Sequence, residues 1–139
     1  MNRQSLNRAV DPMPTFEKRS HKFNAKQKVV DGIKFDSTAE SEYYGILKQR
    51  QQAGIITDLI LQPRYELQPR TILPDRRTVI QPIDYVADFQ ITYPDGRVEV
   101  IDVKGKETEL YRAKAKMFRA RYPELTLKAV KKTRRGWDE

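Results

Sequence analysis

The sequence predicts an α+β fold in which helices cover the faces of a mixed β-sheet. Apolar residues recur at helical spacing over residues 37–52, a lysine-rich segment over 108–121 predicts a second helix, and segments typical of strands lie between the two. Three strands in antiparallel sequence precede the second helix and one strand follows it. Because that helix forms a crossover, a parallel pairing becomes available to the last strand.

The N-terminal elements follow from local signals. Residues 1–28 lack apolar periodicity and contain prolines and scattered basic side chains, so we interpret them as a flexible basic arm. Residues 29–35 predict a short hairpin with the Asp31-Gly32 step as its turn. Ser37 and Glu40 have capping-box spacing and predict a helix that runs to about Gln52 and stops at Gly54.

The remaining elements complete one folded domain over residues 29–131, with a loose C-terminal tail over 132–139. The chain has 139 residues, a length that suits one domain with one core. The expected elements are a strand over 55–67 with an irregularity near Pro63, a polar loop over 69–77, strands over 82–93 and 97–104, a helix over 108–121 and a strand over 125–130.

Composition excludes several kinds of site. The chain has no cysteine, which rules out disulfides, thiolate catalysis and zinc–thiolate centres. His21 is the single histidine, and a solvated loop residue is a simpler interpretation of it than a catalytic base. No apolar run is long enough for a membrane span or a signal-peptide core, so we expect residence in the cytoplasm.

The net charge of +8 is unevenly distributed along the chain. Residues 1–34 and 112–135 are strongly basic, whereas residues 35–111 carry thirteen acids against nine basic groups. A DNA-coating protein needs cations throughout its binding face, so an acidic centre better suits an enzyme that holds phosphates with its flanks and a divalent cation at its centre. The alternative is that the lysine-rich segments are only solvated faces.

The turn 93–97, Tyr-Pro-Asp-Gly-Arg, predicts the register of the hairpin around it. A type I turn followed by a left-handed glycine makes a three-residue loop. In that register Asp88 lies opposite Asp102, and cross-strand partners point to the same face of a sheet. Lys104 shares that face because side chains alternate with a period of two. The opposite face of the first strand is apolar and contains Tyr85, Ala87, Phe89 and Ile91.

This pair of carboxylates is the candidate metal site. Two carboxylates that face each other repel, whereas a divalent cation between them is attracted to both, and Mg²⁺ prefers oxygen ligands. Asp88 and Asp102 are therefore candidate catalytic metal ligands, with the backbone carbonyl of Val103 as a third. Lys104 is a candidate to position the attacking water or to neutralise charge on the phosphate. The alternative is an Asp102–Lys104 ion pair beside a solvated Asp88.

The same segments resemble a known superfamily. The run 86–89, Val-Ala-Asp-Phe, followed after the hairpin by 101–105, Ile-Asp-Val-Lys-Gly, resembles the motif of the PD-(D/E)XK nucleases. Their restriction-endonuclease-like core is a helix, a three-stranded antiparallel meander, a helix and a strand, the order expected here. Together with Leu61-Gln62-Pro63 and the 35–44 segment, the chain is similar to a family of short, mostly phage-encoded proteins of uncharacterised function within that superfamily. Alanine stands where the motif has its proline, a position that is often replaced.

The resemblance implies further roles. In many such nucleases a glutamate on the first helix completes the metal site, a role that would fall here to Glu40. Its place in the capping box is the competing role. Tyr111 and Phe118 are expected in the core. Candidate DNA contacts, each with an equally ordinary interpretation as a surface residue, are Gln62, Arg64, Lys106, Lys114 and Lys116.

We therefore expect a Mg²⁺-dependent DNA endonuclease, with Mn²⁺ as a substitute metal. A short chain has little surface for reading sequence, so recognition of backbone and shape is favoured. Branched DNA in phage recombination or DNA processing, within a bacterial host cytoplasm, is the best single interpretation. Action as a homodimer would let two sites cut two strands. The alternatives are a non-catalytic DNA-binding module with a nuclease-like fold, and cleavage of RNA.

Overall fold

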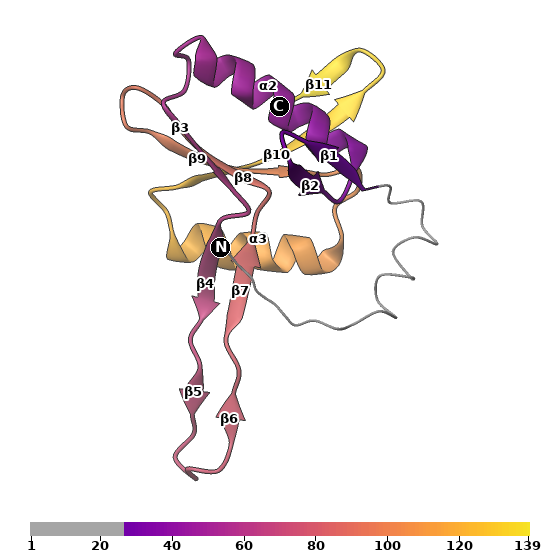
Figure 1. Cartoon of the computed structure of the whole chain (residues 1–139). Coiled ribbons are helices and arrows are strands. Elements are labelled where there is room, and N and C mark those ends of the chain that lie inside the picture. Colours follow the sequence, from indigo (N-terminus) through magenta and orange to yellow (C-terminus); the bar gives the residue numbers. More distant parts are fainter. Residues whose placement is uncertain (1–26) are drawn as a thin grey trace. The chain divides into compact units, whose positions relative to one another are not determined.

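The computed structural model describes residues 27–139 and contains, in that part of the chain, two helices and a mixed five-stranded sheet (Figure 1). The α+β prediction is thus confirmed, while almost all of the predicted arm 1–28 lies outside the described residues. The chain divides into two compact units, Met1–Ser41 and Glu42–Glu139. The boundary lies inside helix α2 (Thr38–Gln52), whereas the sequence predicted a single domain over 29–131.

The first unit contains the predicted hairpin and the start of α2. Strands β1 (Lys28–Val30) and β2 (Ile33–Phe35) pair antiparallel. The turn between them has φ values of 54° at Asp31 and 75° at Gly32, which matches the type of turn that an Asp-Gly step favours. Ser37 caps the helix as the capping-box spacing predicted, because Ser37 Oγ accepts the Glu40 N–H at 3.1 Å, and the Ser37 hydroxyl also donates to Glu40 Oε1 at 3.2 Å.

The second unit is built on the mixed sheet. The β9–β10 pairing is parallel and the others are antiparallel, as the crossover through helix α3 (Glu109–Arg121) allows. Thr108 caps α3, as the predicted helix start requires. In spatial order the strands are β11 (Gly136–Asp138), β10 (Thr126–Thr133), β9 (Val98–Val103), β8 (Phe89–Thr92) and β3 (Asp58–Leu61).

The two faces of this sheet carry different apolar clusters. On the α3 face Phe118 packs with Val100 and Leu127 in the main core. On the other face the ring of Tyr43, from α2, lies 6.1 Å from that of Phe89 and 4.9 Å from that of Trp137, centroid to centroid. The centre of strand β9 is covered from both sides, so Val100, Ile101 and Asp102 are all buried although they are consecutive.

The predicted register of the β8–β9 hairpin is confirmed. Phe89 pairs with Ile101 and Thr92 with Val98, which is the register that the three-residue loop predicts. Gly96 has a φ of 92° and donates its N–H to the carbonyl of Tyr93 at 2.9 Å. Only glycine adopts that conformation freely, so this one residue fixes which side chains lie opposite each other along β8 and β9.

The prediction of one strand over 82–93 was wrong at its centre. The chain bends at Ala87-Asp88, between β7 (Ile83–Val86) and β8. The bend resets the side-chain alternation: Tyr85 and Ala87 pack in the α3-face core, whereas Phe89 and Ile91 do not belong to it. The four residues therefore do not form one apolar face.

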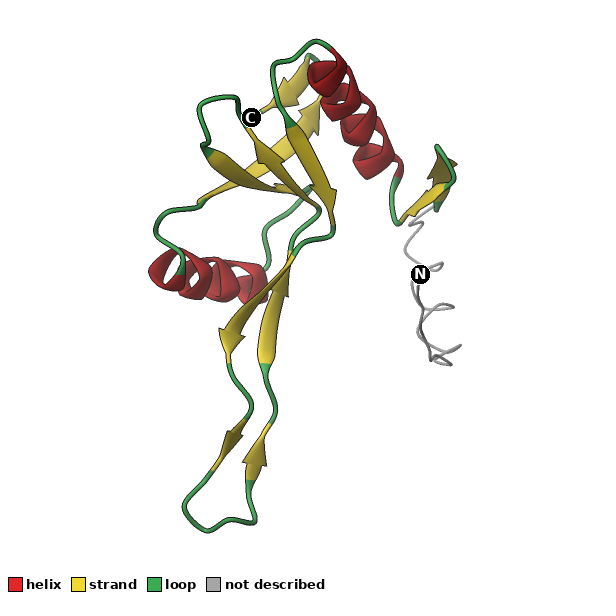
Figure 2. Cartoon of the chain, turned by 60° about the vertical axis from the view of Figure 1, so that its left-hand side comes forward, coloured by secondary structure: helices red, strands yellow, loops and turns green. Residues whose placement is uncertain are grey.

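The bend begins a long β-ribbon. Strand β4 (Arg64–Gln68) pairs with β7, and farther out β5 (Thr71–Ile72) pairs with β6 (Val79–Ile80). The irregularity predicted near Pro63 lies next to it, at Gln62, whose φ is 49°. The prediction of a polar loop over 69–77 was wrong, since part of it is β5. Figure 2 shows the ribbon extending away from the sheet and α3.

The C-terminal residues are also ordered, although the sequence predicted a loose tail over 132–139. Strand β10 continues to Thr133, and β11 pairs with it antiparallel. Glu139 accepts hydrogen bonds from Tyr43 Oη at 3.1 Å and from Arg50 Nη2 at 2.8 Å, which fixes the last residue to α2. Among the described residues no helix is long and apolar enough to cross a membrane.

Candidate metal centre

Asp88 and Asp102 lie together at the point where the ribbon leaves the sheet. The Asp88 N–H donates to the carbonyl of Ile101 at 3.1 Å and to Asp102 Oδ1 at 3.2 Å. In return, Asp88 Oδ2 accepts the N–H of Val103 at 2.8 Å. The two carboxylates are therefore held side by side through crossed bonds to each other's strands, as the register predicted.

The bend explains why the Asp88 side chain takes this position. If β8 had continued straight, the carbonyl of Ala87 would lie opposite Val103 and accept its N–H. Ala87 instead follows the ribbon and donates its own N–H to the carbonyl of Pro63 at 3.1 Å. The Asp88 carboxylate replaces the missing acceptor, which avoids a buried N–H without a partner. Asp88 thus has a structural role whatever its chemistry.

Asp102 is the more unusual of the two carboxylates. Only 2% of its surface is exposed, and its Oδ2 finds no hydrogen-bond partner among the described residues. Burial raises the pKa of Asp102 to about 6, although the positive charge of Lys104 and the Asp88 N–H act in the opposite direction. A buried carboxylate oxygen without a partner is costly unless a cation or a proton reaches it.

Lys104 lies beside this pair and against helix α3. Its Nζ is 4.7 Å from the centroid of the Tyr111 ring, a cation–π distance. Tyr111 is held in the first turn of α3, where its N–H donates to Thr108 Oγ1 at 3.1 Å. Burial raises the pKa of Tyr111 to about 12, with the Asp102 carboxylate as the next cause. The aromatic ring therefore positions the lysine cation near the buried carboxylate.

The residues at this site fit a divalent cation through Asp88, Asp102 and the neighbouring main chain. The fit rests on Asp102 Oδ2, an oxygen donor that lacks a hydrogen-bond partner in the described part of the chain. No group of three histidine, cysteine, aspartate or glutamate side chains that could hold a metal occurs among residues 27–139. Glu40 belongs to the first unit, is half-buried and forms the capping box, so its role as a ligand stays a prediction.

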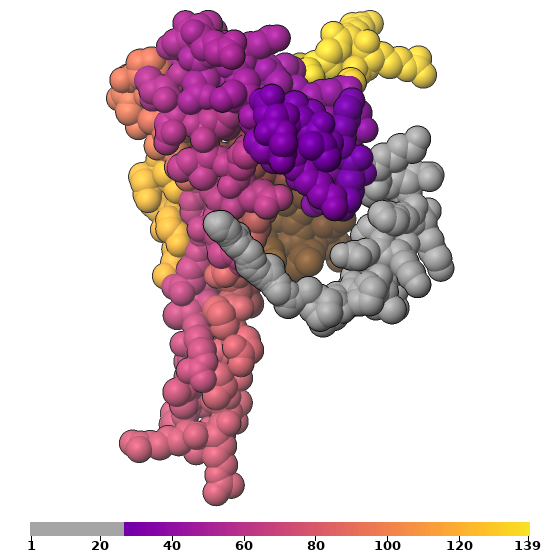
Figure 3. Space-filling model, viewed as in Figure 1, coloured from indigo at the N-terminus to yellow at the C-terminus, as the bar shows by residue number. Residues whose placement is uncertain are grey.

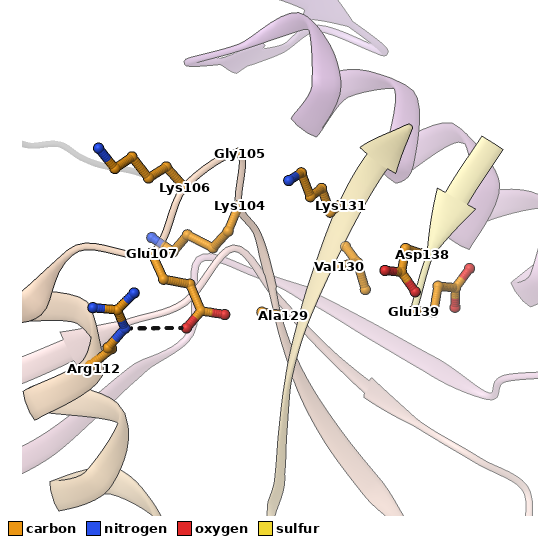
Figure 4. A pocket seen from close by; sticks show the side chains of 10 residues that line it. All are labelled: Lys104, Gly105, Lys106, Glu107, Arg112, Ala129, Val130, Lys131, Asp138 and Glu139. Atoms are coloured by element: carbon orange, nitrogen blue, oxygen red, sulfur yellow. Dashed lines mark ion pairs between the residues drawn. The ribbon is translucent and has the colours of Figure 1, made fainter. Parts of the chain in front are cut away.

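Two hollows open beside Lys104. The larger, of about 490 Å³, is bordered by the loop after β9, by β10 and by the C-terminus, and contains the predicted DNA contact Lys106 together with Lys131 (Figure 4). Three acids also line it: Glu107, which lies 3.9 Å from Arg112, and Asp138 and Glu139 at the C-terminus. The basic groups that line it are Lys104, Lys106, Arg112 and Lys131. The four basic groups outnumber the three acids by one, and the ammonium groups of Lys104, Lys106 and Lys131 would attract an anion such as a phosphate.

The smaller hollow, of about 250 Å³, lies between α3 and the base of the ribbon and also includes Lys104. It is lined by Tyr85 and Tyr111, whose buried hydroxyls have no hydrogen-bond partner among the described residues. Sequence reasoning assigned both tyrosines to apolar packing and missed these hydroxyls. The available signal was the pair of tyrosines where a core would accept phenylalanine, since a buried tyrosine hydroxyl usually has a partner.

The other predicted DNA contacts are dispersed. Gln62 is exposed at the bend, and its N–H donates to the carbonyl of Asp88 at 2.9 Å. Arg64 forms an ion pair with Asp84 at 3.0 Å on the exposed side of the ribbon base. Lys114 Nζ donates to the carbonyl of Asp84 at 3.2 Å, and Lys116 is exposed on α3. Lys106 therefore shares the larger hollow with Lys104, and Lys114 shares the smaller one with it, whereas Gln62 is connected to the site through the main chain.

Comparison with known proteins identifies the family. No curated protein and no solved structure matched the chain. One family model matched residues 20–136, which include helices α2 and α3, the ribbon, the carboxylate pair and every strand of the sheet except most of β11. Its description is "Protein of unknown function (DUF1064)". The chain belongs to this family.

Proposed function

We propose that this protein is a Mg²⁺-dependent DNA endonuclease of the PD-(D/E)XK kind, built on a restriction-endonuclease-like core. The observation that carries the proposal is the buried Asp102 carboxylate, whose Oδ2 has no hydrogen-bond partner among the described residues although Asp88 and Lys104 adjoin it. A fold has little structural reason to bury such a group, and perturbed, incompletely paired acids occur preferentially at functional sites.

The proposed ligands are Asp88, Asp102 and the carbonyl of Val103, with Glu40 as the further ligand that the superfamily resemblance implies. A Mg²⁺ ion bound there would lower the pKa of a water and stabilise negative charge on the scissile phosphate, with Mn²⁺ as a substitute. Lys104 would neutralise charge on the phosphate from the side of α3. The Tyr111 ring restricts where the Lys104 ammonium can lie, so its charge is available without a large reorganisation.

The lysines of the hollow next to Lys104 support a phosphodiester substrate, although three acids also line it. Lys106 and Lys131 border it, and no ion pair holds either side chain in the described part of the chain. A DNA strand bound in this hollow would bring a phosphate next to Lys104, the residue that the hollow shares with the candidate metal centre. Branched DNA, cut by a homodimer in phage-type recombination or DNA processing, is the substrate we propose, since so small a protein favours shape over sequence recognition.

A non-catalytic DNA-binding module is the second candidate, and the crossed hydrogen bonds favour it. Asp88 accepts a main-chain N–H that the bend leaves without its strand partner, so both carboxylates could be retained for structure alone. That alternative does not explain why Asp102 Oδ2 is buried without a hydrogen-bond partner among the described residues. It predicts DNA binding that is independent of metal.

The experiment that separates the two is cleavage of a labelled four-way junction, with linear duplex, single-stranded DNA and duplex RNA as further substrates. The wild type and Asp102→Asn are assayed in Mg²⁺, Mn²⁺ and EDTA. Asp58→Asn, a substitution of an exposed aspartate on β3, is the matched control. We expect metal-dependent cutting of the junction by the wild type and the control, with a loss of at least about 10³-fold in Asp102→Asn.

Each other outcome has a defined meaning. Equal cutting of junction and linear duplex would keep the nuclease and remove the preference for branched DNA. Cutting of duplex RNA alone would mean that the substrate is RNA rather than DNA. If nothing is cut while DNA is bound equally well in EDTA and by Asp102→Asn, the nuclease proposal fails and the binding module replaces it.

A further inference from the structure

The distal part of the ribbon, residues 69–82, has features that the site at its base does not explain. None of its residues is buried, and β5 and β6 pair over only two residues each. Figure 3 shows it as a slender projection from the second unit. A two-stranded ribbon without a core is only marginally stable in water, so a projection of this kind gains from a binding partner.

The prolines of this segment limit what that partner can be. Pro69 and Pro82 fall where the ladder is interrupted between the β4–β7 and β5–β6 pairings. Neither proline has an N–H to donate, which explains why the strand pairing is interrupted between the base and the tip of the ribbon. Prolines also obstruct the addition of a further strand, so pairing with the edge of another sheet is disfavoured.

The tip turn resembles the turn of the β8–β9 hairpin except at one position. Both turns contain Pro-Asp-x-Arg, at residues 74–77 and 94–97. In both, the aspartate accepts the N–H of the following arginine, at 2.9 Å and 3.0 Å. The x residue has a positive φ in both, 58° at Arg76 and 92° at Gly96. Glycine adopts this conformation freely, whereas a side chain is strained in it, and such strain is typical of functional segments.

The charge of the distal ribbon favours a polyanion. Residues 69–82 contain three exposed arginines, Arg70, Arg76 and Arg77, against one acid, and no ion pair holds any of the three within the described residues. That acid, Asp75, is used inside the turn, where it accepts the N–H groups of Arg77 and Thr78. A second copy of the chain on this surface would bring like charges together, which disfavours a dimer contact.

Exposed apolar side chains lie next to these cations. Ile72 and Val79 face each other across β5 and β6, with 56% and 37% of their surfaces exposed. A nucleic-acid duplex offers both kinds of complement, because its phosphates pair with arginine and the thymine methyl group in its major groove accepts apolar contacts. This combination is better satisfied by a duplex than by a soluble anion.

We propose that residues 69–82 form a duplex-binding arm whose tip enters the major groove of B-form DNA, with Arg70, Arg76 and Arg77 on the phosphates. That groove is about 12 Å wide and admits a two-stranded β-ribbon, whereas the major groove of A-form RNA is too deep and narrow for side chains to read. The inference rests on the proposed function only in taking DNA as the partner, since it requires neither metal nor cleavage.

The test measures binding of the full chain to a labelled linear B-form duplex, as a function of salt, in EDTA and in the Asp102→Asn background. The arm variant adds Arg76→Gly and Arg77→Gln, of which the first also relieves the strained φ. The matched control adds Arg97→Gln, which removes an exposed arginine from the other turn. We expect the arm variant to bind about tenfold more weakly, with a salt slope smaller by about two, since each phosphate contact contributes about 0.9.

Other results would overturn the proposal. An affinity and salt slope like those of the Arg97→Gln control would remove the arm from DNA binding. An equal loss on duplex RNA would exclude insertion into the major groove. A loss of self-association in sedimentation, with DNA binding intact, would make the arm a dimer contact. Because the binding assay does not require cleavage, it can support the DNA-binding arm even if no nuclease activity is found. Conversely, nuclease activity would not be excluded if the arm variant bound DNA as well as the control.

Discussion

The two ends of the β-ribbon use charge in opposite ways. At its base, Asp88 is bonded to the main chain and Asp102 is withdrawn from solvent, with one oxygen unpartnered among the described residues. At its tip, Arg76 and Arg77 are exposed on a turn that would be less strained with glycine. Burying charge costs stability and creates reactivity, whereas exposing it costs little and creates a surface for a polyanion.

This difference assigns the two ends different tasks. Changes at the base should alter chemistry, metal binding and the pH dependence of stability. Changes at the tip should alter affinity for DNA and its salt dependence. A variant at the base that changes only catalysis, metal binding or pH dependence supports this division, and so does a variant at the tip that changes only DNA affinity. A variant that changes the property assigned to the other end contradicts it.

The largest effect is expected from Lys104→Met at the base. Loss of a positive charge next to the scissile phosphate should lower the cleavage rate about 10²–10³-fold, measured under single-turnover conditions at saturating enzyme. Lys106→Met, two residues away in the same basic hollow, is the matched control and should lose less than tenfold through weaker binding. Equal losses in the two variants would reduce Lys104 to one DNA contact among several.

Asp102→Asn should raise the stability of the metal-free protein. The folded-state pKa of Asp102 is raised from 3.8 to about 6, so the native state binds this proton more tightly than the unfolded state does. Ionisation of Asp102 therefore lowers the free energy of unfolding. This loss of stability is absent below about pH 4, grows as the pH rises to about 6 and is constant above, where it amounts to about 3 kcal/mol. We expect urea unfolding at pH 7 in EDTA to give Asp102→Asn a free energy of unfolding higher than that of the wild type by most of this amount.

The pH dependence provides the control for that result. The difference in unfolding free energy between the wild type and Asp102→Asn should shrink as the pH falls from 6 to 4. A variant that is less stable than the wild type at pH 7 would mean that the carboxylate pair stabilises the fold, which would favour the non-catalytic alternative.

Tyr111→Phe should separate packing from chemistry at the same site. The Tyr111 hydroxyl is buried without a hydrogen-bond partner in the described part of the chain, so its removal should raise stability by about 1 kcal/mol. The phenylalanine ring can still contact the Lys104 ammonium. A fall in cleavage rate with a gain in unfolding free energy would identify the hydroxyl as a group that acts on substrate or water. A loss of both quantities would contradict this and make it structural.

The smallest effects are expected at the two related turns. Arg76→Gly should stabilise the fold by roughly 0.5–1 kcal/mol and Gly96→Arg should destabilise it by about as much, because both change the cost of a positive φ. Urea unfolding of both variants measures this. Changes of the same sign would contradict the account of strain at the tip.

The sequence predicted the parts of this structure that depend on local turn chemistry. The Asp31-Gly32 and Pro94-Asp95-Gly96 turns each fixed a register, and the register of the second is sufficient to place Asp88 beside Asp102. It did not predict the bend at residue 88, because apolar residues alternate through Ala87 and Phe89 without interruption. The bend depends on tertiary context, namely the neighbouring segment that turns at Gln62.

The ribbon and the C-terminal hairpin were missed for related reasons. Residues 69–77 look like a polar loop because no face of β5 is covered by a core, so the usual alternation of apolar and polar residues is absent. Strand β11 is short, and it is stabilised by contacts distant in sequence, such as that between Trp137 and Tyr43. Such contacts leave no local pattern in a sequence.

The most direct test of the carboxylate pair as a metal site is the thermal stability of the full chain in increasing Mg²⁺, starting from EDTA. A ligand that binds only the folded state stabilises it by about 2.7 kcal/mol at one hundred times its Kd. We expect the Tm of the wild type and of the Asp58→Asn control to rise with Mg²⁺ and then saturate, while that of Asp102→Asn stays flat. An equal rise in all three proteins would contradict a metal site at Asp88 and Asp102.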